Sequence, residues 1–461
     1  MKARKIVICF DGTGNEIGDY QTNIIKLYNA LRNDDQQITH YVPGVGTFDE
    51  PRLFDWKWRQ KARAVAGLAF GLGLEDDVLD AYRFLCRNYK STQQKNREWN
   101  FEQRLKRELG GKKPAPRPEA QKDQIYIFGF SRGAYAARIL AGFIHNFGLI
   151  APDKLHLATG AFRAYRAVTD TDRALPHSVT FRQLRRYEDA LKPDANVPIH
   201  ALCLFDTVSS MVSFQRPIRN LLRNFSPMEL RVHANVDSNP SVRIVLHALA
   251  TDEKRSMFRP LFWTPDPAYY GNRFRHEGQK RRQYVRQRWF PGYHSDIGGS
   301  PRERESGIGK LTLLWMLDAL HEAELAANRE DRAKAPPDRR RDLPLPAPGL
   351  RLNPKRREVH FEGRRREVKS LDGTPYARPD AMAEIHDSMS IWWYPLEILP
   401  KSIKRRGWPG RIAWLWKWYL PLEEPRAIPM GHELDDSLAE RTRRWPFYQP
   451  RNLPPPGTKA S

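Results

Sequence analysis

The sequence predicts an α/β fold in which a mostly parallel β-sheet carries helices on both faces, followed by a basic, Pro- and Trp-rich C-terminal module. Three observations predict it. Short apolar runs alternate with amphipathic segments. A serine flanked by glycines stands between one of these runs and a helix, and the composition changes near residue 330. Strands that alternate with helices are typical of parallel sheets covered on both sides.

Six apolar runs have the length and composition of buried strands. They are residues 5–10, 38–42, 125–130, 198–205, 242–250 and 285–290. Three segments instead place apolar residues at helical spacing, and these are residues 74–89, 134–147 and 307–326.

The domain organisation follows from composition. We expect a catalytic domain over residues 1–330 and a C-terminal module over 331–461. Within the first domain, the charged stretch 92–124 holds a Gly-Gly pair and three prolines, so we expect a surface insertion there.

The net charge limits the classes of partner. The 461 residues carry 77 Lys and Arg against 54 Asp and Glu, a formal charge of +23. Such a surface attracts polyanions, whether anionic lipid or nucleic acid. The three cysteines indicate neither a disulfide framework nor a zinc site. No signal peptide is recognised, and no run approaches the ~20 apolar residues of a membrane-spanning helix, so we expect a cytoplasmic protein, at least before any export.

The most informative motif is Gly129-Phe130-Ser131-Arg132-Gly133, which joins a predicted strand to a predicted helix. In α/β-hydrolases this sharp turn presents a nucleophilic serine above the sheet. The glycines Gly129 and Gly133 are needed there because strand and helix pack without room for side chains. We therefore expect Ser131 to be a nucleophile, against the alternative of an ordinary glycine-rich turn.

Acyl transfer also requires N–H donors for the developing oxyanion. The backbone N–H of Arg132, the residue after the nucleophile, is the first candidate. Gly12 and Thr13, at the end of the first strand, are candidates for the second. The alternative for this loop is a tight turn in which Asp11 binds its own backbone.

A general base and an acid should follow the serine along the chain. His294, in a glycine-rich loop after the last predicted strand, is the expected base. Two acids compete, because Asp206 and Asp252 each follow a predicted strand. Asp252 belongs to the strand nearest before that of His294, where this fold usually holds its acid, so Asp252 is favoured and Asp206 is the alternative.

These motifs together resemble a known family. The segments that carry the resemblance are 9–15, 129–135, 205–208 and 294–299, with further support from 71–89 and 252–255. The chain closely resembles, from about residue 5 to 300, the uncharacterised α/β-hydrolase domain family that includes type VI secretion lipase effectors. The resemblance implies phospholipase A-type hydrolysis of phospholipid by a Ser-Asp-His triad, which corresponds here to Ser131, Asp252 and His294.

The resemblance also implies partners. It suggests an antibacterial effector that leaves the cell by a type VI route, with a secretion-apparatus or immunity partner. After about residue 330 the resemblance extends only to residues 385–388.

The segment 401–417 carries basic residues and tryptophans and lacks acids. Such a segment suits an anionic membrane surface, because basic and aromatic side chains both favour the head-group region. A solvated basic face with core-packed tryptophans and stacking on single-stranded nucleic acid are the alternatives, and nucleic acid is the least favoured. The membrane-binding candidates are Lys404, Arg405, Arg406, Arg411, Trp408, Trp414 and Trp416.

Two alternative functions belong to other classes. The stretch Phe10-Asp11-Gly12-Thr13 is similar to the opening motif of haloacid-dehalogenase-type phosphatases, but Cys9 stands where their nucleophilic aspartate would be. A non-catalytic basic binding protein on a hydrolase scaffold stays an alternative, because a fold does not guarantee activity. We expect neither a cofactor nor a metal.

Overall fold

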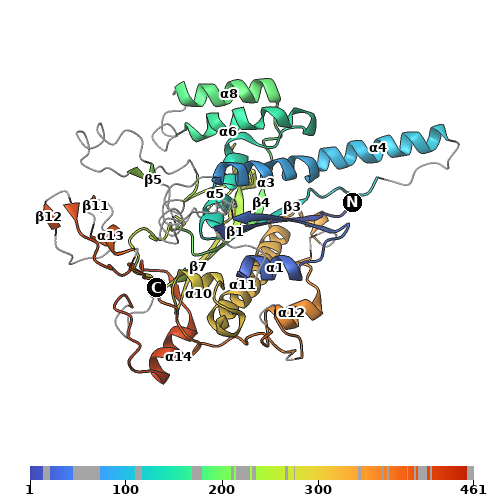
Figure 1. Ribbon diagram of the computed structural model, residues 1–461. Coiled ribbons are helices and arrows are strands. Elements are labelled where there is room, and N and C mark those ends of the chain that lie inside the picture. The colour runs from blue at the N-terminus through green and yellow to red at the C-terminus, as the bar shows by residue number, and fades with distance from the viewer. Residues whose placement is uncertain are drawn as a thin grey trace, which may run out of the picture.

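A seven-stranded sheet forms the centre of the computed structural model (Figure 1). The structure describes residues 1–13, 21–44, 73–109, 117–168, 179–208, 212–213, 229–230, 235–264, 268–274, 276–340, 345, 347–365, 367–370, 373–391, 393–398, 401–402, 413–415 and 418–453.

The strand order of the central sheet is β14-β10-β7-β4-β3-β1-β2, and every neighbouring pair is parallel. Its strands are β1 (Lys5–Thr13), β2 (Gln37–Gly44), β3 (Gln124–Phe130), β4 (Ile199–Phe205), β7 (Val242–Ala250), β10 (Tyr284–Phe290) and β14 (Glu433–Leu434). Because all seven strands run the same way, their carboxyl ends share one edge of the sheet, the place where open α/β folds bind ligands.

Apolar side chains explain why the inner strands form. Every residue of β7 is buried, and so is every residue of β3 after its first. Strands covered on both faces read as continuous apolar runs, which is why the sequence identifies them without alternation. The six predicted strands all occur, within a few residues of the expected bounds.

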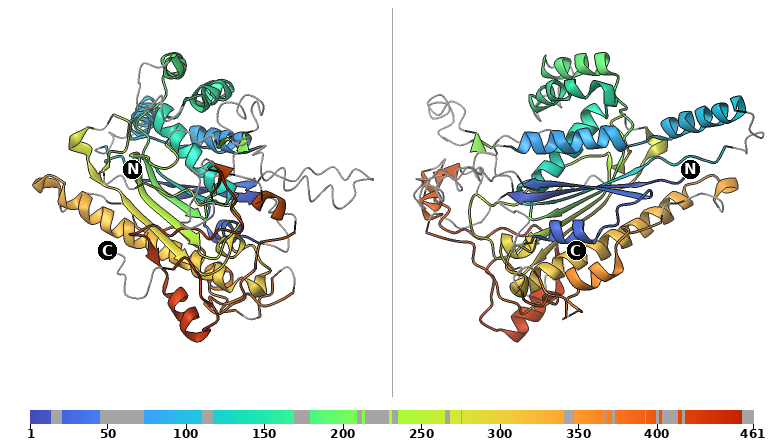
Figure 2. Two further views of the ribbon diagram at one scale, coloured as in Figure 1. Left: turned by 90° about the vertical axis from the view of Figure 1, so that its left-hand side faces the viewer. Right: turned by 45° about the vertical axis from the view of Figure 1, so that its right-hand side comes forward.

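Two helical layers cover the sheet, one on each face (Figure 2). On one face lie α3 (Leu74–Asn88), α5 (Arg132–Phe147) and α6 (Ala158–Arg166), whose apolar residues share a core with one side of the strands. The other face is covered by α1 (Asn23–Ala30) and α11 (Gly307–Ala333), which build a second core. The remaining longer helices are α4 (Thr92–Glu108), α8 (Val179–Leu191), α12 (Pro354–His360) and α14 (Asp436–Arg444).

Short elements complete the described part of the chain. They are the helices η1 (Pro152–Leu157), η2 (Glu277–Gln279), α10 (His294–Gly298), η3 (Glu303–Glu305), η4 (Pro337–Arg339) and α13 (Tyr394–Glu397), and the strands β5 (Val212–Ser213), β6 (Glu229–Leu230), β8 (Ala268–Tyr269), β9 (Arg281–Arg282), β11 (Lys401–Ser402), β12 (Ala413–Leu415) and β13 (Trp418–Tyr419).

The expected insertion at 92–124 contains the helix α4, which extends away from the sheet (Figure 1). It starts at a capping box, in which Ser91 accepts a hydrogen bond from the Gln94 N–H and the Gln94 side chain accepts one from the Ser91 N–H. Lys95 is its one buried residue. A helix with so little apolar surface gives almost no periodic signal, so the sequence showed the charge of this segment and not its helicity.

The residues after 330 pack against the sheet and extend it. The expected boundary falls inside α11, and β14 pairs with β10 through Arg288 and Trp289. Leu438 of α14 is buried beside Trp289. The division into a catalytic domain and a C-terminal module stays a prediction, but the two stretches share one sheet.

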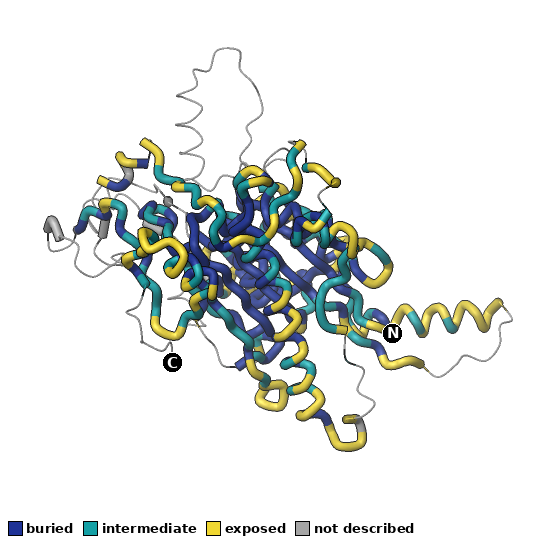
Figure 3. The backbone as a smooth tube through the Cα atoms, turned by 90° about the horizontal axis from the view of Figure 1, so that it is seen from below, coloured by how far each residue is buried: buried dark blue, intermediate teal, exposed yellow. Residues whose placement is uncertain are grey.

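Burial is concentrated in the strands and in the inner faces of the helices (Figure 3). Within the described ranges, no helix has both the length and the apolar character needed to cross a bilayer.

Candidate active site

Ser131 stands at the turn between β3 and α5, as the sequence predicts. Its backbone has φ 58°, a value that side-chain-bearing residues rarely adopt and that is typical of a strained functional turn. The Ser131 N–H donates to the carbonyl of Phe205 at 3.0 Å, which ties the turn to the end of the neighbouring strand β4. The side chain is therefore held above the carboxyl edge of the sheet.

The two glycines beside Ser131 allow the close packing that the motif requires. A Cβ atom on Gly129 would lie 2.6 Å from the Cα of Ala134, and one on Gly133 would overlap the backbone of Phe10 and Asp11. Any larger residue at either position would push α5 away from β1 and β3. Gly129 and Gly133 thus occupy the positions expected for a nucleophile turn.

His294 begins the short helix α10, directly after β10. Its Nε2 accepts a hydrogen bond from Ser131 Oγ at 2.7 Å. The ring is fixed on two sides, because it stacks on Phe130 and meets the edge of Phe258. The His294 N–H donates to Glu253 at 3.3 Å. The structure thus brings the expected nucleophile and the expected base into hydrogen-bond contact.

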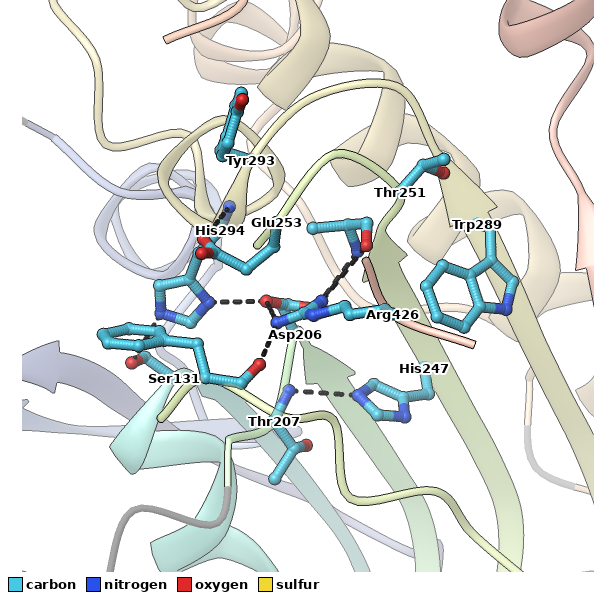
Figure 4. Close-up of polar contacts among 12 residues, drawn as sticks. Ser131, Asp206, Thr207, His247, Thr251, Glu253, Trp289, Tyr293, His294 and Arg426 are labelled. Atoms are coloured by element: carbon cyan, nitrogen blue, oxygen red, sulfur yellow. Dashed lines mark hydrogen bonds and ion pairs between the residues drawn. The ribbon is translucent and has the colours of Figure 1, made fainter. Parts of the chain in front are cut away.

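Asp206 supplies the carboxylate that faces the other nitrogen of His294. Nδ1–H of His294 donates to Asp206 Oδ2 at 2.6 Å, so serine, histidine and aspartate form one chain of hydrogen bonds (Figure 4). Asp206 directly follows β4, the strand next to that of Ser131, and has φ 42°. Its N–H donates to the carbonyl of Ala248 at 2.8 Å, which fixes the turn against β7.

The preference for Asp252 over Asp206 as the partner of the histidine is contradicted by this geometry. Asp252 Oδ2 accepts hydrogen bonds from the Gly292 N–H at 2.6 Å and from the Tyr448 hydroxyl at 2.7 Å. Counting strands along the chain favoured Asp252 because it follows the strand just before His294. In space, however, β7 separates β10 from β4, and the histidine reaches across it to the strand beside the nucleophile.

Arg426 also belongs to this site, although no feature of the sequence pointed to it. Its Nη1 and Nη2 groups donate to Asp206 Oδ1 at 2.6 Å and Oδ2 at 2.9 Å (Figure 4). Asp206 Oδ1 also accepts from the Ala250 N–H at 3.1 Å. Arg426 lies in an irregular stretch far along the chain, so no periodicity or local motif marks it.

Charged partners favour an ionised Asp206, and burial favours a neutral His294. Burial alone would raise the pKa of Asp206, but the Arg426 guanidinium and the His294 ring hold it well below its usual range. Burial lowers the pKa of His294, although Asp206 opposes this effect. A buried, neutral imidazole beside a carboxylate is the state in which a histidine accepts a proton from serine.

The turn at Asp206 is held from behind by a second histidine. The Thr207 N–H donates to His247 Nε2 at 3.0 Å (Figure 4). Burial and the nearby Arg138 hold the pKa of His247 well below its usual range, so this ring is a neutral acceptor. We infer that His247 stabilises the backbone that carries the triad carboxylate.

The expected oxyanion donors differ in their backbone surroundings. Arg132 is the first residue of α5, so its N–H belongs to the amino-terminal turn of a helix, where anions are favoured. The Gly12 N–H instead donates to Asp11 Oδ1 at 2.7 Å, so Asp11 binds the adjacent backbone, as the alternative predicted, and this N–H is already engaged. The tight turn itself is absent, because Gly12 and Thr13 lie in β1. Asp11 is held in turn by Thr22 and Tyr41. Thr13 as the second donor stays a prediction.

Most of the membrane-binding candidates lie outside the described residues. Lys404, Arg405, Arg406, Trp408, Arg411 and Trp416 belong to this group. Trp414 lies in β12, of which only the backbone is described. As for metals, the described part of the chain contains no cluster of three or more His, Cys, Asp or Glu side chains that could hold an ion.

Comparison with known families gives one match that covers most of the chain. The sequence model described as "T6SS, Phospholipase effector Tle1-like, catalytic domain" matches residues 4–319. This range contains Ser131, Asp206 and His294, and it ends before Arg426.

Individual relatives are more distant. An uncharacterized protein of Saccharomyces cerevisiae is 28% identical over 270 residues, which cover 57% of this chain and 33% of the yeast protein. An uncharacterized protein from Pseudomonas aeruginosa, known from a crystal structure, is 18% identical with a TM-score of 0.33 over 70% of this chain and 46% of that one. The Tle1 effector bound to the VgrG spike of the type VI secretion system is 18% identical with a TM-score of 0.30, over 67% of this chain and 53% of that one. The chain thus spans a third to about half of the length of these relatives.

Proposed function

Because the chain belongs to the family of Tle1-like phospholipase effectors of the type VI secretion system, we propose that it is a serine esterase that hydrolyses the acyl esters of phospholipids. The observation that carries the proposal is the unbroken series of hydrogen bonds from Ser131 through His294 to Asp206. This is the arrangement that activates serine in hydrolases of unrelated folds.

The proposed reaction proceeds in two halves. His294 Nε2 takes the proton of Ser131 as Oγ attacks the carbonyl carbon of the acyl ester, and a tetrahedral intermediate forms. The same nitrogen then gives this proton to the leaving alcohol oxygen, so that the acyl chain stays on Ser131. His294 then deprotonates a water molecule, whose oxygen attacks the acyl carbonyl carbon. The bond to Ser131 Oγ breaks, His294 returns the proton to Oγ, and the fatty acid leaves. Asp206 stays ionised throughout and stabilises the imidazolium.

The oxyanion of the intermediate is assigned to the amino-terminal end of α5. The Arg132 N–H lies next to the nucleophile in sequence, and the helix dipole adds partial positive charge at the same point. Thr13 is the remaining candidate for the second donor.

Delivery and membrane contact are part of the same proposal. The family description names type VI effectors, and one solved relative is described as bound to the VgrG spike. We infer export by this route, with a secretion or immunity partner. The basic, tryptophan-rich segment 401–417 is the proposed contact with anionic membrane, since the formal charge of +23 favours such a surface.

The proposal is tested by labelling and lipid analysis of purified protein. Ser131 should react with a fluorophosphonate probe, and incubation with phospholipid vesicles should release fatty acid and lysophospholipid. Ser131→Ala should abolish both reactions while its circular dichroism spectrum stays native. If the protein neither reacts with the probe nor releases fatty acid, the non-catalytic binding alternative replaces this proposal.

A further inference from the structure

One side chain of the C-terminal stretch enters the triad. Arg426 is 5% exposed, and both of its terminal nitrogens contact the carboxylate of Asp206. These two contacts form a bidentate pair, the geometry in which a guanidinium binds a carboxylate most firmly. They leave the triad acid with His294 on one side and Arg426 on the other (Figure 4).

The position of Arg426 is itself fixed by the loops of the catalytic edge. Nη1 also donates to the carbonyl of Ala250 at 3.1 Å, and Nη2 donates to the carbonyl of Phe258 at 2.5 Å. The backbone is held as well, because Asn452 Nδ2 donates both to the Arg426 carbonyl and to that of Thr251. The arginine is therefore held between the ends of β4 and β7 and does not reach in from solvent.

The carboxylate of Asp206 could not be held equally well without this arginine. A buried carboxylate offers about four acceptor positions. Here Arg426 fills two of them, His294 a third and the Ala250 N–H a fourth. Because burying a charge is costly unless it is paired and hydrogen-bonded, loss of the guanidinium would favour rotation of Asp206 or entry of water.

We propose that Arg426 is a positioning residue which holds the Asp206 carboxylate against His294, so that the catalytic site is complete only when the segment 418–453 is in place. This inference rests on the proposed function. It goes beyond it because Arg426 lies outside residues 4–319, the range matched by the family's catalytic domain.

The positive charge of Arg426 also affects the protonation of His294. Asp206 and Glu253 favour the imidazolium form of His294, whereas Arg255 disfavours it. A further cation on the far side of Asp206, Arg426, also disfavours this form and so helps to keep the base neutral. The base works in its neutral form, and activity is lost as the pH falls through its pKa. Removing the positive charge should raise that pKa, which moves the acid limb of the pH profile to higher pH.

The experiment compares three variants of the full chain on a soluble acyl ester. Arg426→Gln removes both the positive charge and the bidentate contact, whereas Arg426→Lys keeps the charge and loses the bidentate contact. Arg441→Gln is the matched control, because Arg441 is also buried in the C-terminal stretch but donates to the carbonyls of Ala381 and Ala383 and not to the triad. Turnover, KM, the pH profile and the melting temperature are measured for each.

We expect kcat to fall roughly 10- to 100-fold in both Arg426 variants with little change in KM, by analogy with outer residues that orient metal ligands. The acid limb should move to higher pH in Arg426→Gln and stay in place in Arg426→Lys. Arg441→Gln should lower the melting temperature and leave both kcat and the pH profile unchanged.

The inference is overturned if the Arg426 variants keep the kcat and pH profile of the unmodified protein, or if Arg441→Gln reproduces their effects at an equal loss of stability. If Arg426→Gln does not fold, Arg426→Lys provides the test. A purely structural role of Arg426 predicts a normal kcat for the folded lysine variant, whereas a positioning role predicts a reduced one. The activity of the unmodified protein distinguishes failure of the proposed function from failure of the role of Arg426. If it has no esterase activity, the proposed function fails before any variant is made.

Discussion

The ends of the neighbouring strands β4 and β7 look alike in sequence and differ in chemistry. Both strands are buried apolar runs, and each is followed within two residues by an aspartate, Asp206 or Asp252. Asp206 contacts Arg426 and His294. The donors to Asp252 are the neutral Gly292 N–H and Tyr448 hydroxyl.

Burial raises the pKa of both carboxyl groups, but their different partners give net shifts in opposite directions. The pKa of Asp206 is held well below its usual range by Arg426 and His294, in spite of burial. Burial raises the pKa of Asp252 to about 6, because its neutral donors compensate the lost hydration less well. The comparison teaches that position at the catalytic edge is insufficient for a triad acid. A charged partner must also hold the carboxylate in its ionised form.

The largest effect is expected from Asp206→Asn. The amide cannot stabilise the imidazolium and favours the wrong ring tautomer, so turnover should fall roughly 10³- to 10⁴-fold, as in other triads that lose this carboxylate. Turnover of a soluble ester measures the loss. Asp252→Asn serves as the control and should cost much less. A larger loss in Asp252→Asn would reverse the assignment of the two acids.

The second-largest effect is expected in the pH dependence of stability, to which Asp252 contributes. Its pKa in the folded protein, about 6, lies above the ordinary value of 3.8, so the folded state binds more protons between these two pH values. The free energy of unfolding should therefore fall as the pH rises from about 4 to 6, by at most about 1.4 kcal/mol per pH unit from this group. Asp252→Asn should remove that part of the slope. Urea unfolding at several pH values measures it, and an unchanged slope in the variant would contradict the assignment.

The smallest effect concerns the acid limb of the pH profile of hydrolysis. Burial lowers the pKa of His294 from its ordinary 6.5, and the base works in its neutral form. The acid limb of kcat/KM should therefore have its midpoint below pH 6.5. Asp206 stays ionised across this range, so it should add no second step. A midpoint above pH 7, measured on a soluble ester, would show that the histidine is more strongly stabilised as a cation than its burial indicates.

Local features of the chain were sufficient for much of the fold and part of the site. Residues 242–250 are apolar except for Arg243 and His247 because their strand is covered on both sides, and this pattern is visible without any tertiary contact. The glycines around Ser131 are similarly local, since the turn they permit lies within five residues. The exposed helix α4 has no such signal, because hardly any of its surface is buried.

What the sequence by itself determined, then, is the parallel α/β architecture, the turn that presents Ser131 and the loop that presents His294. Each depends on residues close together in the chain, whose spacing reflects strand, turn and helix geometry. Only the tertiary structure decided between Asp206 and Asp252 and introduced Arg426. The order of strands in a sheet is not the order in the chain, and a bidentate contact between residues 220 positions apart leaves no pattern in either segment.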